Sequence, residues 1–439
     1  MIKDNVETVG LRVWLAVAAV TLIPLQGHAH IASEHRDLAV GGYVGLSYAP
    51  ALRGVTNFRI GEPYSNGTRA VLPYKRDDGA EVLRADRFDW TATDTKITFD
   101  DSAVFAVMGR MGFAYKRARI ELEVGHESFP ARFHDKNGDH DSETGLYLLA
   151  KDMAYDVISG NTARLRESLQ AQSAEDIESF AHVLHASHPD VDSLLCKNGQ
   201  KIVVSDYVRW HMAQDNVRLR DEIGGNCGGG KRPLDGTFRF TSKEDPGLNA
   251  AVSYDGRGKW PNVSKIQDWW YWRDYGVSEG EDSSDQVAGE MTDMGMDNRA
   301  IVAGHLAKTI EGGEVVEIRS VTSTSVMVNA CYDLVVGVGD RIMPYACVGY
   351  GGDFVAVGGK VAPKPAYKLK VGLSYKLSSS VYAHLGGYVH HVMGSGEYEK
   401  LRVYRLTDDS SPDGRTKDYA VASFGLSYTG GEMGVRIVF

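Results

Sequence analysis

Histidines and carboxylates are the residues of this chain that could carry out chemistry, and their spacing argues against a catalytic or metal site. His182, His185 and His188 recur every three residues on an expected helix, and two histidines one turn apart can bind zinc. No H-E-x-x-H motif supplies the accompanying carboxylate, so we interpret them as solvated surface residues. The oxygen-rich run 135–141 lacks the Gly and Glu that an EF-hand needs at its sixth and twelfth positions. Because no G-x-S-x-G elbow marks a nucleophile either, we expect no catalytic residue, no metal ion and no cofactor.

Aromatic residues form a second group. Trp269, Trp270, Tyr271 and Trp272 are consecutive and are our candidates for contact with a host molecule, since such rings can stack on sugars or on a partner. Aromatic clusters more often form the core of a small loop domain, and that interpretation stands beside the first.

A third group consists of charged residues on the polar side of segments that alternate between apolar and polar positions. Its members are Arg110, Arg119, Glu121, Glu123, Asp333, Lys368, Lys370 and Arg436. In a small barrel these side chains would meet in the lumen as a salt-bridge network, where pairing offsets part of the desolvation cost. A soluble β-sandwich could instead expose them to water.

The segments that must position these charges have the period of two that marks a half-buried strand. Eight such segments are found, at residues 44–48, 105–115, 119–124, 326–334, 344–351, 367–377, 381–390 and 423–439. Tight connections at 116–117 and 378–380 lie on one side and long connections on the other, as in outer-membrane barrels. The last strand ends in Phe439, which we interpret as the terminal assembly signal of such a barrel.

The last segment also contains a change of parity. Its apolar residues are even-numbered from Phe424 to Tyr428 and odd-numbered from Met433 to Phe439. Because side chains alternate with a period of two, we expect a one-residue slip at 429–431. A bulge within one long strand is favoured over a hairpin between two strands, because the bulge keeps the strand count even.

The N-terminal residues and the composition agree with an exported β protein. Lys3 and Arg12 precede an apolar run at 13–25, and Gly27 and Ala29 are small residues at the −3 and −1 positions of a cleavage site, which is typical of a secretory signal peptide. The chain of 439 residues has 49 Gly and 22 Tyr, which suits twisted strands better than a helical enzyme. Its net charge of −10 argues against nucleic-acid binding. We therefore expect an all-β transmembrane barrel of about eight antiparallel strands, in preference to a sandwich.

The central part of the chain departs from the strand pattern. Leu146, Leu149, Met153 and Val157 follow a helical spacing, and helical periodicity continues to about residue 184. Loops of this length are functional or disordered, so we expect a large, partly helical extracellular insertion. The predicted organisation is a signal peptide at 1–29, barrel strands one to three with the first external loop at 30–129, the central insertion at 130–320, and barrel strands four to eight at 321–439.

The four cysteines are candidates for disulfides, because export would place them in an oxidising compartment. In one register of their hairpin, Cys331 lies directly opposite Cys347, at a separation that a disulfide can bridge with small adjustments. Cys196 and Cys227 would then form the second pair. A shift of one residue would separate Cys331 from Cys347 and leave two buried thiols instead.

Several runs resemble the rickettsial surface antigen family. They are 324–334, 344–349, 372–375, 407–417 and 434–439, and the stretches 145–151 and 154–157 resemble its subgroup of major surface protein two and immunodominant relatives from tick-borne intracellular bacteria. The resemblance covers roughly 40–160 and 315–439. It implies that the flanks form an outer-membrane barrel and that the central region is displayed, varied and bound by antibody. Porin activity and host-cell adhesion are also attributed to members of the family.

Together these observations predict a bacterial outer-membrane surface antigen, exposed at the cell surface after cleavage of the signal peptide. It would display a variable region for immune evasion and host-cell contact. The alternative is a porin-type diffusion channel for small hydrophilic solutes, although eight strands leave an interior that side chains can fill. The expected partners are outer-membrane lipid, host-cell surface molecules and antibody, with no nucleic acid, and a homo-oligomer stays open.

Overall fold

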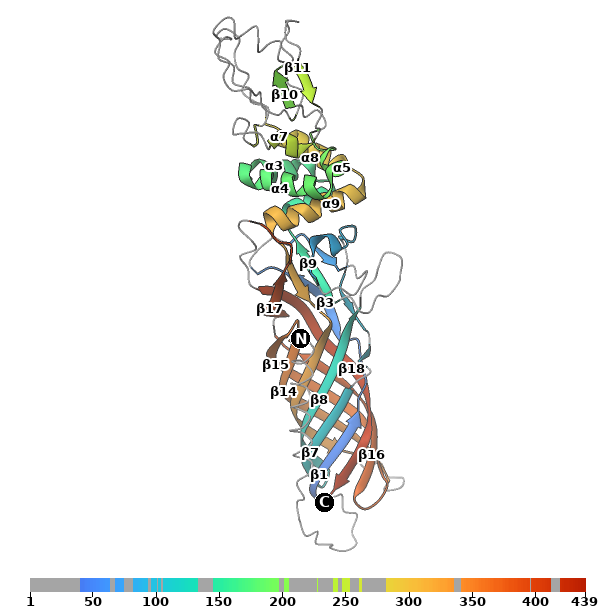
Figure 1. Ribbon diagram of the computed structural model, residues 1–439. Helices are drawn as coiled ribbons and strands as arrows, with labels where there is room; N and C mark the ends of the chain where they lie inside the picture. The colour runs from blue at the N-terminus through green and yellow to red at the C-terminus, as the bar shows by residue number, and fades with distance from the viewer. Residues whose placement is uncertain are drawn as a thin grey trace, which may run out of the picture.

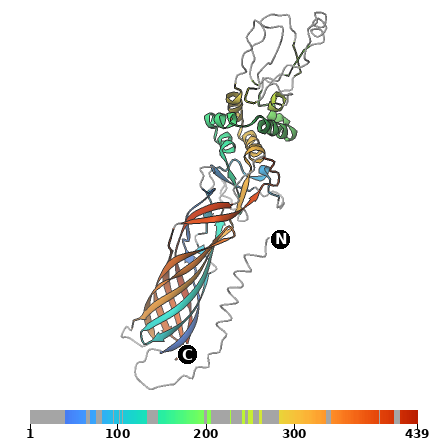
Figure 2. The same ribbon diagram turned by 90° about the vertical axis from the view of Figure 1, so that its left-hand side faces the viewer.

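The computed structural model describes residues 40–439 with internal gaps (Figures 1 and 2). The gaps are 64–67, 75–81, 94–95, 101, 104–105, 133–144, 197–200, 205–226, 228–239, 244–246, 253–259, 263–281, 335–340, 395 and 412–418. The predicted signal peptide at 1–29, the oxygen-rich run at 135–141 and the aromatic run at 269–272 therefore lie outside the described residues.

Eight antiparallel strands close into a ring at one end of the elongated molecule (Figure 1). In ring order they are β1 (Gly41–Tyr48), β7 (Ala106–Tyr115), β8 (Ala118–Arg132), β13 (Ser320–Asp333), β14 (Ile342–Val357), β15 (Lys360–Lys376), β16 (Val381–Val392) and β18 (Tyr419–Val438). Closure comes from β18, which pairs with both β16 and β1. The eight-stranded antiparallel barrel predicted from the alternating segments is confirmed.

The connections differ between the two ends of the barrel. Short connections at 116–117, 334–341 and 377–380 lie at the end where β1 begins and β18 ends. Three long connections lie at the opposite end, but Gly358 and Gly359 join β14 to β15 there by a tight turn. Both glycines have positive φ (53° and 75°), a conformation that glycine adopts without steric cost. The expectation that every connection at this end is long is therefore wrong for one hairpin.

Strand β18 has no slip at 429–431, so the predicted bulge is wrong. Its pairing with β16 runs without a break from Val381 opposite Ile437 to His391 opposite Ser427. Even-numbered side chains of β18 face inward along its whole length, from Phe424 to Arg436. The apolar parity changes because the barrel interior changes from charged to apolar along its axis, while the strand itself keeps one register.

Beyond the ring, the upper half of β18 leaves β1 and continues into a second sheet. There it pairs with β3 (Val55–Gly61) on one edge and β17 (Glu397–Arg405) on the other, and the sheet continues through β12 (Glu314–Glu317), β9 (Leu146–Ala150) and β4 (Ala70–Pro73). Of the short strands, β2 (Ala51–Leu52) pairs with β18 and with β6 (Ser102–Ala103), and β5 (Thr98–Phe99) pairs with β8. The predicted helix is wrong over 146–150, because this run is a strand buried between β4 and β12, and the helix begins only at Asp152.

Helices form a separate layer at the far end of the molecule, which we call the head (Figures 1 and 2). They are α2 (Asp152–Ser159), α3 (Thr162–Gln170), α4 (Ala174–Ser187), α5 (Pro189–Asp192), α7 (Leu248–Val252), α8 (Ser284–Asp293), α9 (Met296–Leu306) and the single turn η2 (Ala307–Glu311). Gly160 ends α2 with a φ of 73°, and Ser173 caps α4 by accepting a hydrogen bond from the Asp176 amide. Val157, Phe180 and Leu306 belong to a shared buried core. The remaining described elements are the turn η1 (Ala85–Arg87) and the hairpin β10 (Lys201–Val204) with β11 (Phe240–Lys243).

None of the described helices combines the length and apolarity that crossing a membrane would require.

Candidate functional site: the barrel interior and the head

The centre of the lumen holds a network of buried charges. Lys368 Nζ lies 2.9 Å from Glu123 Oε1, and Lys370 Nζ lies 2.7 Å from Glu121 Oε1 and 2.5 Å from Glu123 Oε2. Asn329 donates its amide hydrogens to both glutamates. These four charged side chains are at most 1% exposed. The network forms because alternate residues of β8, β13 and β15 point to the same face of the closed sheet.

Arginines continue this network toward the end with short turns. Arg119 forms two hydrogen bonds of 2.9 Å with the Asp333 carboxylate, and Arg110 lies 2.8 Å from Glu432. Tyr345 donates a 2.6 Å hydrogen bond to Glu432. Glu432 was absent from the predicted set, although it shares the parity of Arg436 on β18, and that shared parity was the signal that could have identified it.

Arg436 differs from the other predicted luminal residues. Its guanidinium lies over the rings of Tyr382 and Tyr43, 4.8 and 5.4 Å from their centroids. Among the residues that the structure describes, no carboxylate forms a salt bridge with it. The structure therefore brings all eight predicted charges into one lumen but pairs only seven of them.

A second polar layer lies further along the lumen. Ser323 donates to Asp353, His390 Nε2 lies 2.8 Å from the same carboxylate, and the His390 ring stacks on Tyr428. Serine, histidine and aspartate are all present, but the Ser323 hydroxyl contacts the carboxylate and not the imidazole. A nucleophilic triad needs the imidazole to accept the serine proton. The cluster is also fully buried, so we assign it a packing role.

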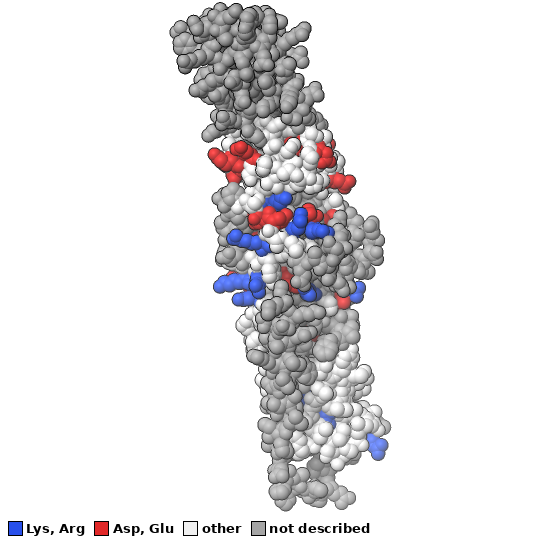
Figure 3. All heavy atoms as spheres, in the orientation of Figure 1, with Lys and Arg blue, Asp and Glu red and all other residues white. Residues whose placement is uncertain are grey.

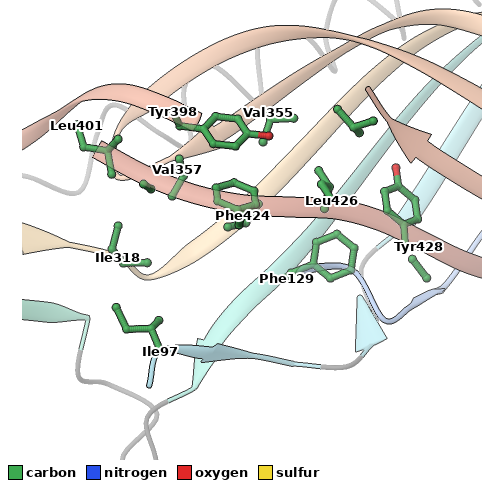
Figure 4. Close-up of a cluster of buried hydrophobic side chains, with 14 of the residues drawn as sticks. Ile97, Phe129, Ile318, Val355, Val357, Tyr398, Leu401, Phe424, Leu426 and Tyr428 are labelled. Carbon is green, nitrogen blue, oxygen red and sulfur yellow. The ribbon is translucent and has the colours of Figure 1, made fainter. Parts of the chain in front are cut away.

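Apolar side chains fill the lumen beyond this layer, a group that we call the apolar plug (Figure 4). It includes Phe129, Val355, Leu401, Phe424 and Leu426, all at most 3% exposed. The plug packs between the upper part of the ring and the second sheet. Charged network, polar layer and plug together occupy the lumen along its described length.

The outer surface of the ring is apolar. Leu46, Val328, Val348, Leu369, Leu385 and Val435 are among its exposed side chains. Aromatic residues mark both ends of this band, with Phe113, Tyr115, Tyr332, Tyr375 and Phe439 at one end and Tyr48, Tyr350 and Tyr367 at the other. On the face seen in Figure 3, the described residues of this band carry almost no charge. An uncharged band between aromatic belts fits the hydrocarbon layer of a membrane.

Both pairs of cysteines are bonded. Strands β13 and β14 pair with Cys331 opposite Cys347, and a disulfide joins them. Glu121 lies close to both sulfurs, but the disulfide leaves no thiolate to bind a metal ion. A second disulfide joins Cys196 to Cys227 in the head.

The three histidines in and directly after α4 do not converge on one point. His182 is exposed, whereas the Nδ1 atom of His185 lies 3.0 Å from Asp192 Oδ2. His188 Nδ1 lies 3.2 Å from Nε2 of His305, which also contacts Ser187. Burial lowers the pKa of His305 to about 3, with a further contribution from Lys308. Two of the three regularly spaced histidines therefore make contacts within the head, to Asp192 and to His305.

Acidic residues predominate on the head, whereas many exposed residues at the rim of the barrel nearest the head are basic (Figure 3). Exposed Glu397 and Glu399 also lie at this rim. Exposed basic residues at the rim form a group that we call the collar: Arg53, Arg59, Lys360, Lys400 and Arg402. The described part of the head is rich in acidic residues, among them Glu167, Glu175, Glu178, Asp190, Asp285, Asp293 and Asp297. A basic rim above an apolar band suits the anionic headgroup region of a membrane.

Comparison with known proteins adds to this geometry. A model of the surface antigen family matches residues 36–200 and 251–439. The chain belongs to this family. Major surface antigen 4 of Anaplasma marginale is 31% identical over 125 residues, which are 28% of this chain and 42% of that protein. The chain thus matches less than half the length of that relative.

Solved structures also resemble parts of the fold. The outer membrane protein OprG from Pseudomonas aeruginosa aligns with a TM-score of 0.34 at 5% identity, covering 92% of this chain and 99% of its own. Neisserial surface protein A aligns with a TM-score of 0.25 at 8% identity, covering 91% and 97%. The family and the membrane-type barrel make this surface antigen an outer-membrane protein.

Proposed function

We propose that the barrel is a closed anchor that holds the head, and the central segment carried on it, outside the outer membrane for contact with host-cell molecules and antibody. The observation that supports this most directly is the filled lumen. Lys368, Glu123 and Tyr428 are at most 1% exposed, and the apolar plug lies beyond them. A barrel whose described interior is filled by side chains serves attachment better than solute diffusion.

The position of the insertion supports a display role. All elements of the head lie in the connection between β8 and β13, at the end opposite the C-terminus (Figure 1). The family model leaves 201–250 unmatched, within the stretch that the family resemblance predicts to be variable. A connection between two anchored strands can change in sequence without disturbing the barrel.

The proposal includes cleavage of the signal peptide after residue 29 and contains no catalytic step. The porin alternative requires an open lumen, and the packed interior of the described barrel gives it less support. Host-cell molecules and antibody are proposed as partners of the head, and outer-membrane lipid as the partner of the apolar band.

Site-specific labelling of intact cells tests the proposed topology. Glu178 is exposed on α4 of the head and Lys116 is exposed in a short turn, so Glu178→Cys and Lys116→Cys form a matched pair. A membrane-impermeant maleimide should label Glu178→Cys on intact cells, and Lys116→Cys only after the outer membrane is permeabilised. Labelling of Lys116→Cys but not Glu178→Cys on intact cells would refute the display role.

A further inference from the structure

A small void lies in the periplasmic part of the lumen, and its lining is strongly cationic. Its volume is about 10 Å³, and it is lined by Arg110, Arg119, Tyr345, Ser374, His384 and Arg436. No carboxylate is among these lining residues. A void of this size has room for one water-sized particle.

The arginines around the void are unequally neutralised. Arg110 is paired with Glu432, and Arg119 with Asp333 and Glu121. Arg436 is only 6% exposed and stacks between two tyrosines, with no carboxylate partner among the described residues. The Nε–H groups of Arg110 and Arg436 are buried and donate to no acceptor within the described residues. A buried guanidinium without a counter-charge is strongly unfavourable, so this end of the lumen lacks one negative charge.

The unused N–H donors and the missing negative charge both indicate an anion as the ligand. The void offers the unused N–H donors and the hydroxyl of Ser374, and no carboxylate that would favour a cation is among its lining residues. The hydroxyl proton of Tyr345 is already donated to Glu432. An anion would satisfy the donors and neutralise the excess charge of Arg436. The small volume favours a small anion, and a halide is the simplest ion that meets this requirement.

We infer that the periplasmic end of the barrel lumen binds one halide ion, chloride in the cell, between the guanidinium groups of Arg436 and Arg110. The ion neutralises the unpaired charge of Arg436 at this end of the lumen and holds the periplasmic ends of β15, β16 and β18 together. It belongs to the anchor and is independent of what the head contacts.

Thermal unfolding of the refolded full-length protein tests this site. The midpoint in sodium chloride or bromide should rise above that in sodium gluconate at equal ionic strength, and the rise should saturate with halide concentration. Arg436→Met keeps an apolar stem between Tyr382 and Tyr43 but removes the charge, so this variant should lose the halide response. Lys116→Met is the matched control, because Lys116 also lies over a tyrosine ring at this end but is exposed, and it should keep the response.

A second measurement covers the case in which Arg436→Met fails to fold. Crystals of the wild-type protein grown in bromide should give an anomalous peak in the void between Arg436 and Arg110. Equal midpoints in all three salts, a halide response that persists in Arg436→Met, or a void that holds only water in bromide would each overturn the inference.

Discussion

At the residue scale, the direction in which a side chain points decides what it does. On β16, Leu385 is 60% exposed to the membrane side, whereas the adjacent His384 is buried beside Ser47 and faces Arg110 and Arg436 across the void. Neighbouring positions thus face hydrocarbon and a cationic interior. This alternation is why the same substitution has different consequences one residue apart.

Leu385→Arg should impair membrane insertion by about 2–4 kcal/mol, because it places a charge near the middle of the hydrocarbon layer. Leu377→Arg is the matched control: Leu377 is also exposed (58%) but lies in the short turn after β15, where the cost should fall to about 0–1 kcal/mol. Urea-dependent folding into lipid vesicles measures both. Equal costs at the two positions would contradict a membrane-spanning band around Leu385.

The buried ion pair between Arg110 and Glu432 gives a second prediction at this scale. Glu432→Gln should destabilise the barrel by about 3–5 kcal/mol, since it leaves Arg110 buried without its counter-charge. The double substitution Arg110→Met with Glu432→Gln should recover much of that loss, because it removes both charges. A double-mutant cycle from denaturant unfolding checks this, and simple additivity of the two single changes would show that the pair is not coupled.

At the scale of elements, the sequence predicts the eight ring strands well because each alternates for several residues with one face in lipid. Prediction fails where the surroundings change along an element. The apolar residues of 424–428 are even-numbered, unlike those of 433–439, because the lumen becomes apolar there. The sequence of one strand does not indicate whether the barrel interior beside it is polar or apolar. Leu146–Ala150 is apolar on both faces, so its spacing cannot separate a buried strand from a helix.

The luminal site was predictable to the same degree. Parity placed Lys368 and Glu123 on one face, but which charges would pair depends on register across four strands. The Asp353 and His390 layer was missed because its members come from distant segments with no shared motif. Pairing of this kind depends on how the closed barrel brings distant segments together, and the local spacing of residues does not indicate it.

The contact between α4 and α9 makes the head sensitive to acid. His305 has its pKa lowered to about 3 in the folded head, against an ordinary value near 6.5. The unfolded head therefore binds a proton more readily, so stability is full above about pH 6.5 and falls as the pH drops toward 3. Lowering the pH from 7 to 5 should cost about 2 kcal/mol.

Hydrogen exchange of α4 and α9 at the two pH values, corrected for intrinsic rates, measures this loss. His305→Gln should flatten the dependence, because it removes the group that titrates, while the exposed His182→Gln should leave it unchanged. The same acid sensitivity in His305→Gln as in the wild type would assign the effect to other groups.

At the scale of the whole molecule, charge and apolarity are arranged along the long axis. The uncharged band lies between the short turns and the collar, and the acidic head lies beyond the collar (Figure 3). Anionic headgroups would attract the collar and repel the head, which favours a head that stands away from the membrane surface. The filled lumen, the apolar band and the distant head together suit an anchor for display.

Conductance across a planar lipid bilayer tests the closed anchor most directly. The refolded full-length surface antigen should insert without producing steady, large channels, because charged pairs, the Asp353 layer and the apolar plug occupy its lumen. Heat-dependent migration of the same sample on gels provides the control that the barrel is folded. Steady channels from folded protein, with a conductance that grows with the number of inserted molecules, would contradict the account and favour a porin.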